Sequence, residues 1–317
     1  EALFLLMLVG GLYLLRRATE EGSLLVFVLS GALLSASALV RPIVLYLLPV
    51  SLVATFAVLI HRKGLKRACS VFVAIVIAAG FVLLPWVYRN FETSGVAALS
   101  SKAAFNLYFY DAAQTMAYRE NISDQRAVET LLARIKDKRP EVNSLEDLRS
   151  LEYAPLLTEE AVAVIRESPS LFIKMYAISL GTFFLSDGYR LLWYEMSGGA
   201  ITLPNITRAI ATGKTDIIWE YLRSEPLQAS AFLFGFLFWA ATFLLALIGT
   251  ARGLLRGERS LQLAVLASVV IVAYFALLTG PVAQARYRIV VTPFLFMLAS
   301  YGVTIVGSYL HAKRKKT

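Results

Sequence analysis

The chain has 317 residues, of which 58% are hydrophobic and 17% are charged, and its mean hydropathy is +0.65. A water-soluble domain carries more polar surface than this, so the composition excludes an ordinary soluble protein and predicts contact with membrane lipid. The net charge is +9, but the basic residues gather between apolar runs, a pattern that indicates membrane topology and not nucleic-acid binding.

Six apolar runs are long enough to cross the roughly 30 Å of bilayer hydrocarbon, which takes about 20 helical residues. They lie near residues 24–40, 43–60, 68–87, 229–250, 261–279 and 289–309. Residues 2–15 are also apolar, and we interpret them as the tail of a further span. The sequence therefore predicts an all-α polytopic membrane protein with membrane helices in residues 1–87 and again in residues 229–317.

Four short basic segments predict the orientation of these helices. They are Arg16 with Arg17, and residues 61–67, 251–259 and 311–316. Loops rich in Lys and Arg stay in the cytoplasm, so we expect all four segments, and the C-terminus, on the cytoplasmic side. Residues 88–228 then form one large extracytoplasmic loop domain, in which acidic residues outnumber basic ones. We expect an integral protein of a bacterial inner or plasma membrane.

Inside this predicted loop domain, residues 170–186 are apolar enough to suggest a seventh crossing. A crossing there would move the basic segments 251–259 and 311–316 to the outside, against the topology rule. We therefore expect an interfacial or re-entrant helix near 170–186. Residues 123–138 and 157–168 begin with polar capping residues and continue with helical periodicity, which predicts two surface helices.

Polar side chains at the outer ends of the predicted spans are the candidates for binding a lipid phosphate. The candidates are Arg41 in the SALVRP segment, Arg89 and Asn90 in PWVYRN (85–90), and Arg286, Tyr287 and Arg288 in ARYRIVVTP (285–293). A guanidinium binds phosphate oxygens in pairs and stays charged beside lipid. The alternative for each arginine is a simple interfacial anchor. Residues two apart on a regular helix point in different directions, so Arg286 and Arg288 face one phosphate only if the loop is irregular.

Other chemistry finds little support in the sequence. Glu92 and Asp111 lie near Arg89 and could accept a proton from a hydroxyl group, but we interpret both as solvated loop carboxylates. Cys69 is the single cysteine, and His61 and His311 are far apart. We therefore expect no metal site, and no catalytic residue is assigned.

Three segments resemble a known family. SALVRPIVLYLLP, then PWVYRN followed by FNLYF (105–109), and finally ARYRIVVTPFLFMLASYG (285–302) are similar in order and spacing to family 39-like glycosyltransferases of the GT-C superfamily. This superfamily includes the dolichyl- and polyprenyl-phosphate-mannose-protein mannosyltransferases. The resemblance covers roughly residues 24–309 and implies a GT-C-like helical bundle.

The resemblance also implies an activity. Such an enzyme transfers a sugar from a polyprenyl-phosphate donor to a protein, lipid or glycan acceptor at the extracytoplasmic face. We expect no cofactor, because the lipid-linked sugar is the donor substrate, and the sequence leaves a metal requirement open. Arginines would stabilise the departing phosphate, with Arg286 and Arg288 first and Arg89 and Arg41 behind them. The family's catalytic carboxylate lies in the first external loop and matches no position here. We therefore expect this chain to be a C-terminal part that lacks that loop.

Two other classes of function stay open. A polytopic transporter or lipid flippase would also have many spans, although no acidic residue lies within any of the complete predicted spans, where a transporter often needs one. A polymerase or ligase of cell-envelope polysaccharide would share the lipid-linked substrate and the external arginines.

Overall fold

A computed structural model describes residues 2–186, 188, 196, 213, 216–224, 226–280 and 285–314, without the side chains of residues 217 and 286. Contacts between residues divide the chain into two compact units. The N-terminal unit comprises residues 1–109 and 125–163, and the C-terminal unit comprises residues 110–124 and 164–317. Each unit is described here by itself. Within the described residues all regular elements are helices and no strand occurs.

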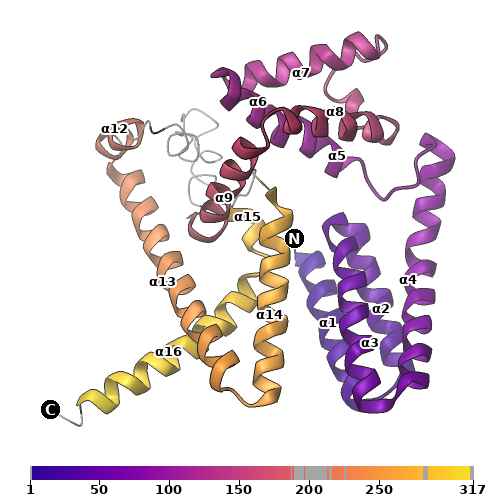
Figure 1. The fold of residues 1–317 in the computed structure, drawn as a ribbon, viewed down its shortest axis with the longest axis vertical. Coiled ribbons are helices and arrows are strands. Elements are labelled where there is room, and N and C mark those ends of the chain that lie inside the picture. Colours follow the sequence, from indigo (N-terminus) through magenta and orange to yellow (C-terminus); the bar gives the residue numbers. More distant parts are fainter. Residues whose placement is uncertain are drawn as a thin grey trace. The chain divides into compact units, whose positions relative to one another are not determined.

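The N-terminal unit contains four long helices that run antiparallel to one another in sequence order (Figure 1). They are α1 (Ala2–Glu21), α2 (Leu24–Val40), α3 (Leu47–Lys63), which follows the short 3-10 helix η1 (Pro42–Tyr46), and α4 (Leu65–Ser94). Helix α1 has 20 residues and is long enough to cross a membrane, whereas we expected only the tail of a span. Helix α2 has 17 residues, which is close to the shortest length that crosses.

Small residues let the first two helices approach closely. A Cβ atom added at Gly11 would lie 2.7 Å from the side chain of Leu34, so only glycine fits between α1 and α2. The hydroxyl of Ser30 donates a 2.7 Å hydrogen bond to the carbonyl oxygen of Gly11. Such contacts between small residues are a main source of helix association in lipid, where burying apolar surface gains little.

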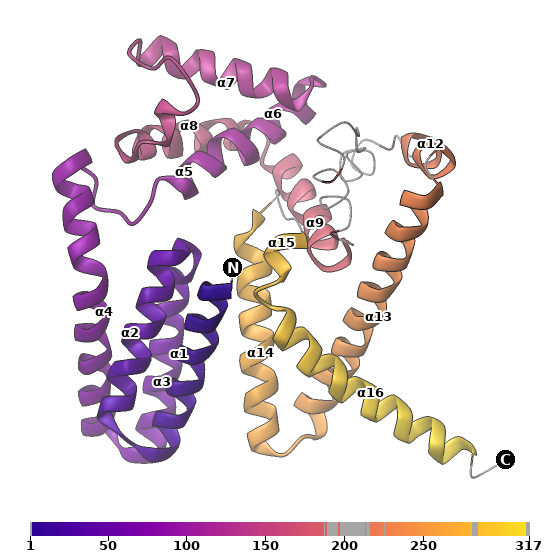
Figure 2. The ribbon, with the colours of Figure 1, turned by 180° about the vertical axis from the view of Figure 1, so that it is seen from behind.

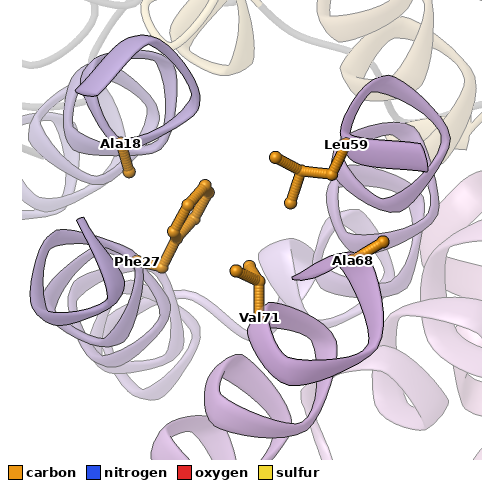
Figure 3. Close-up of a cluster of buried hydrophobic side chains, with 5 residues drawn as sticks. All are labelled: Ala18, Phe27, Leu59, Ala68 and Val71. Atoms are coloured by element: carbon orange, nitrogen blue, oxygen red, sulfur yellow. The ribbon is translucent and has the colours of Figure 1, made fainter. Parts of the chain in front are cut away.

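Near the turn between α1 and α2, apolar side chains from α1, α2, α3 and α4 meet in one cluster (Figure 3). The cluster contains Ala18, Phe27, Leu59, Ala68 and Val71. The guanidinium of Arg67 also donates to the carbonyl oxygen of Gly22 in the turn between α1 and α2. The apolar cluster and this hydrogen bond hold the turn against the start of α4.

Shorter helices complete the N-terminal unit. They are α5 (Lys102–Asn106), the start of the π-helix η2 (Leu107–Ala112), α7 (Asp124–Lys138), the 3-10 helices η3 (Asp147–Arg149) and η4 (Leu151–Tyr153), and most of α8 (Ala154–Glu167). The two surface helices predicted from periodicity are confirmed as α7 and α8. The phenol of Tyr108 donates a 3.0 Å hydrogen bond to the carbonyl oxygen of Leu131, which fixes α7 beside η2.

The C-terminal unit holds three further long helices (Figure 2). Its elements are α6 (Ala113–Glu120), α9 (Pro169–Leu185), α12 (Asp216–Ser224), α13 (Pro226–Arg256), α14 (Arg259–Leu278), α15 (Ala285–Arg288) and α16 (Thr292–Arg314). Helices α13 and α16 cross at glycines. A Cβ at Gly249 would lie 2.1 Å from the carbonyl oxygen of Leu298, and one at Gly302 would lie 2.0 Å from that of Leu245. The two backbones are therefore in direct contact.

Six of the described helices are long and apolar enough to cross a membrane, if η1 and α3 are counted together as Pro42–Lys63, and α2 falls just below that length. The protein is therefore an all-α polytopic integral membrane protein, as its composition predicts. The six do not coincide with the six expected runs, because α1 qualifies and α2 does not. The kind of membrane and the side on which each loop lies stay predictions.

The segment 88–228, expected to be one loop domain, supplies helices to both compact units. Most of residues 187–215 lie outside the described residues, so the single loop domain stays a prediction. Helix α9 corresponds to the expected interfacial segment and begins after a break at Ser168. The chain bends by 100° at this break, the geometry of a broken span or a re-entrant segment. Its buried stripe consists of Met175, Ser179 and Phe183.

Candidate functional site

The last turns of α4 hold the PWVYRN segment in a defined arrangement. The indole of Trp86 donates a 3.1 Å hydrogen bond to the carbonyl oxygen of Leu99. The buried amide of Asn90 donates to the carbonyl oxygens of Ala98 at 2.8 Å and Leu99 at 3.4 Å. These bonds tie the chain that leaves α4 at Gly95, whose φ is +70°, back onto the helix. Asn90 therefore has a structural role in this part of the chain.

Arg89 lies between these two residues and is exposed. Its guanidinium carbon lies 5.0 Å from the centre of the Trp86 ring, and its Nη1 donates a 3.1 Å hydrogen bond to the Asn90 side-chain oxygen. Both neighbours are themselves fixed by backbone hydrogen bonds, so the guanidinium is held in place at low entropic cost. Its remaining N–H groups make no hydrogen bond within the described residues. An anion can therefore bind there.

A cavity of about 240 Å³ lies between the long helices of the N-terminal unit. Its lining is mainly aliphatic and includes Leu34, Leu52, Ile75 and Val76. The lining also includes Ser35, whose buried hydroxyl has no hydrogen-bond partner among the described residues. An apolar cavity of this size within membrane helices suits a segment of hydrocarbon chain better than a polar ligand.

Arg41 lies at the junction of α2 and η1, as the SALVRP pattern indicates. Its backbone N–H donates a 2.9 Å hydrogen bond to the carbonyl oxygen of Ser37, which ends α2 just before Pro42. Its guanidinium carbon lies 5.7 Å from the centre of the Phe4 ring. Arg41 is half-buried and packs against α1, so it is less accessible than Arg89.

Arg288 has a different environment, because its side chain is 2% exposed. Its Nη1 donates to the carbonyl oxygen of Phe183 at 2.8 Å and its Nη2 to that of Ser186 at 2.5 Å. The guanidinium also lies over the Trp239 ring of α13, 3.7 Å from its centre. Arginine here satisfies carbonyls at the C-terminus of α9 and complements the negative end of the helix dipole. This arrangement favours a structural role over the phosphate-binding role that we predicted.

The neighbours of Arg288 are less informative. Tyr287 is half-buried on α15, and the side chain of Arg286 lies outside the described residues. Residues 285–288 form one regular helical turn. The irregular backbone that would let Arg286 and Arg288 face one phosphate is therefore not present.

Asp111 was interpreted as a solvated loop carboxylate, but in the structure the residue is only partly exposed. Its Oδ1 atom is buried and has no hydrogen-bond partner among the described residues. Burial raises the pKa of the Asp111 carboxyl from 3.8 to about 7, because the charged form loses its hydration. Asp111 also lies in the π-helix η2, an element that is rare and often marks functional sites. Glu92, in contrast, is exposed as expected.

The surroundings of Asp111 come from three helices of the C-terminal unit. The side-chain oxygen of Gln114, one turn further along the chain, is also buried without a partner among the described residues. Tyr176 of α9 is close enough for the Asp111 charge to contribute, after burial, to raising the tyrosine pKa. Gly280 follows α14 with φ +62°, and a Cβ added there would lie 3.5 Å from Asp111 Oδ2. Two buried hydrogen-bond acceptors, Asp111 Oδ1 and Gln114 Oε1, are therefore three residues apart in the sequence, and the Asp111 carboxyl lies beside the backbone of Gly280.

A signal for this region is present in the sequence. Asp111 and Gln114 are separated by two alanines and follow the aromatic run FNLYFY. An acid directly after such a run, followed by two small residues, indicates burial more than solvation. Among the described residues, no group of three His, Cys, Asp or Glu side chains lies together as a metal site would require.

Comparisons with known proteins found no relative of this chain. No family model matches the chain, and neither a curated protein nor a solved structure matches it. The resemblance to family 39-like glycosyltransferases therefore rests on the three sequence segments.

Proposed function

We propose that this protein is a membrane glycosyltransferase that uses a polyprenyl-phosphate-linked sugar as donor and a protein, lipid or glycan as acceptor. The observation that carries the proposal is the pairing, on one helix, of a fixed and exposed arginine with an apolar cavity. Arg89 ends the apolar part of α4, and Ile75 of the same helix lines the cavity.

The spacing of these two residues suits a lipid phosphate. Arg89 follows Ile75 by about four helical turns, which places the two roughly 21 Å apart along α4 and on nearly the same face. A phosphate bound by Arg89 can then direct its hydrocarbon chain along α4 towards the cavity. The guanidinium can bind two phosphate oxygens at once, and the membrane lipid around α4 is a favourable environment for the hydrocarbon chain of the ligand.

The reaction itself involves one bond broken and one formed. The bond between the sugar C1 and the phosphate oxygen breaks, and its electron pair stays on the phosphate. A new bond forms between C1 and the acceptor oxygen, and the acceptor hydroxyl proton passes to a base or to the released phosphate. An arginine at the phosphate stabilises the negative charge that develops on it. The positive-inside pattern supports the extracytoplasmic side for this chemistry.

The geometry changes the order of the candidate arginines. Arg89 now comes first, since it is exposed, and is fixed by Trp86 and Asn90. Arg41 follows, because it is half-buried against Phe4. Arg288 is engaged with the end of α9. Arg286 keeps its place as a candidate from the sequence.

The other classes of function predict different observations. A transporter or flippase would move polyprenyl phosphate across the membrane without consuming its sugar. A polysaccharide polymerase or ligase would release a polyprenyl diphosphate from a longer lipid-linked glycan. Both would be compatible with Arg89, so the products of the reaction distinguish them from the proposed enzyme.

Binding of undecaprenyl phosphate to the purified protein tests the proposal, with undecaprenol as the matched lipid that lacks the phosphate. We expect the phosphate lipid to bind at least about tenfold more tightly, because charge-assisted hydrogen bonds contribute the difference. Arg89→Ala should remove this preference without changing the affinity for undecaprenol. Ser35→Leu, which fills part of the cavity, should weaken the binding of both lipids.

Lys66→Ala is the matched control, because Lys66 is an exposed cation at the opposite end of the same helix. It should leave both affinities unchanged. In a protein that also carries the expected first external loop, release of undecaprenyl phosphate from an undecaprenyl-phosphate-hexose, in the presence of acceptor membranes, then identifies a transferase. Equal affinity for the two lipids in the wild-type protein would contradict the proposed function.

A further inference from the structure

Asp111 and Gln114 present two buried acceptor oxygens that lack donors within the described residues. Buried polar groups in folded proteins nearly always have hydrogen-bond partners, so such a pair calls for an explanation. The two residues are three positions apart at the junction of η2 and α6, and therefore lie on the same side of the chain. Their chemistry identifies what is missing, which is a group with at least two hydrogen-bond donors.

The surroundings of the pair favour a neutral ligand. Tyr176 of α9 lies near enough for the Asp111 charge to affect its pKa, and a tyrosine supplies a hydroxyl and an aromatic face. On the side of α14, Gly280 places only backbone beside the carboxyl, with Asp111 Oδ2 at 3.5 Å from a hypothetical Cβ. Carboxylate, amide and aromatic ring together are the groups with which proteins bind vicinal sugar hydroxyls, because each hydroxyl donates one hydrogen bond while the ring covers an apolar sugar face.

We propose that Asp111 and Gln114 form a saccharide-binding site in the C-terminal unit, in which two sugar hydroxyls donate hydrogen bonds to Asp111 Oδ1 and to Gln114 Oε1. The choice of a saccharide among hydroxyl-bearing ligands rests on the proposed function. The same chemistry can come from the sugar of the lipid-linked donor or from a sugar on the acceptor.

The test measures saccharide binding directly and does not depend on the phosphate. The probes are methyl α-mannoside and methyl α-glucoside as soluble sugars, and an undecaprenyl-phosphate-hexose compared with undecaprenyl phosphate as the lipid-linked sugar. Binding is followed by saturation-transfer NMR for the soluble sugars and by native mass spectrometry for the lipids. Wild-type protein should bind at least one soluble sugar, or bind the sugar-bearing lipid more tightly than the bare one.

At pH 8, where the Asp111 carboxyl is charged, Asp111→Asn should lower this saccharide affinity about tenfold or more, because it replaces a charged acceptor by a neutral one. The change is isosteric and removes a buried charge, so the fold is retained. Gln114→Met, which keeps the size of the side chain and removes its acceptor, should act in the same direction. Asp216→Asn alters an exposed carboxylate of the same unit and should have no effect.

The two arms identify the source of the sugar. An Asp111-dependent signal from the soluble sugars alone indicates the acceptor, and one from the lipid alone indicates the donor. Saccharide binding that is equal in wild type, Asp111→Asn and Gln114→Met would overturn the site, as would the absence of binding in both arms. Since Arg89 and undecaprenyl phosphate are tested without any sugar, the proposed function can fail or hold independently of this result.

Discussion

The guanidinium of Arg288 lies 3.7 Å from the centre of the Trp239 ring while it donates hydrogen bonds to the last carbonyls of α9. The Phe296 ring of α16 stacks on the same indole at 5.8 Å. Trp239 lies thirteen residues into α13, roughly 20 Å along the helix. A single cation thus joins α9, α13 and α15, and because it is 2% exposed, its charge would be costly to bury without these partners.

Replacing Arg288 by alanine should destabilise the C-terminal unit. The change leaves the carbonyl oxygens of Phe183 and Ser186 without donors and uncovers the Trp239 ring. We expect the free energy of unfolding to fall by roughly 3–5 kcal/mol, from two charge-assisted hydrogen bonds and one cation–π contact. Thermal unfolding of the purified protein in detergent measures the effect. Arg252→Ala, at an exposed position of α13, is the control, and an equal shift in both variants would contradict the capping role.

The crossing of α13 and α16 should not tolerate a side chain at Gly302. A Cβ there would lie 2.0 Å from the Leu245 carbonyl oxygen, so Gly302→Ala must push the two helices apart. We expect a loss of about 2 kcal/mol or more. Gly307 lies on the same helix with open space around it, and Gly307→Ala should be neutral or stabilising by about 0.5–1 kcal/mol. Similar unfolding temperatures for the two variants would rule out the close crossing.

Stability should depend on pH through Asp111. Because its pKa rises from 3.8 to about 7 in the folded protein, the folded state holds a proton that the unfolded state releases between these values. The free energy of unfolding should therefore fall as pH rises from about 4 to about 7, and level off above that. Asp111→Asn should flatten this part of the profile and be the more stable protein at pH 8, by at most roughly 4 kcal/mol.

Unfolding temperatures measured across this pH range test the prediction. The variant Asp216→Asn should follow the wild-type profile, since Asp216 is exposed. A wild-type profile that rises between pH 4 and pH 7, or an Asp111→Asn profile that parallels it, would show that Asp111 is not buried as described.

Asn90 should hold the chain that follows α4. Asn90→Ala removes the donors to the carbonyl oxygens of Ala98 and Leu99, at an expected cost of about 1–3 kcal/mol. Residues 95–101 should then be cleaved faster in limited proteolysis. Glu92→Gln changes an exposed neighbour on the same helix and should leave the cleavage rate unchanged. If Asn90→Ala is as resistant as wild type, the amide is not what fixes this turn.

Much of the architecture could be predicted from local patterns. The apolar runs predicted long helices because their length and composition are local properties of the sequence. The surface helices α7 and α8 followed from capping residues and periodicity for the same reason. For the first helix we expected an apolar tail over residues 2–15, whereas the helix continues through Arg16 and Arg17 to Glu21.

The sequence by itself determined the class of the protein, an all-α membrane protein, and singled out Arg41, Arg89 and Arg288 as arginines at the ends of spans. Only the tertiary structure decided which partners each of these arginines has. Arg288 contacts a carbonyl 105 residues away, and the Asp111 carboxyl lies beside Gly280 at the end of α14. Burial and hydrogen bonding depend on such distant partners, and no local pattern of residues specifies them.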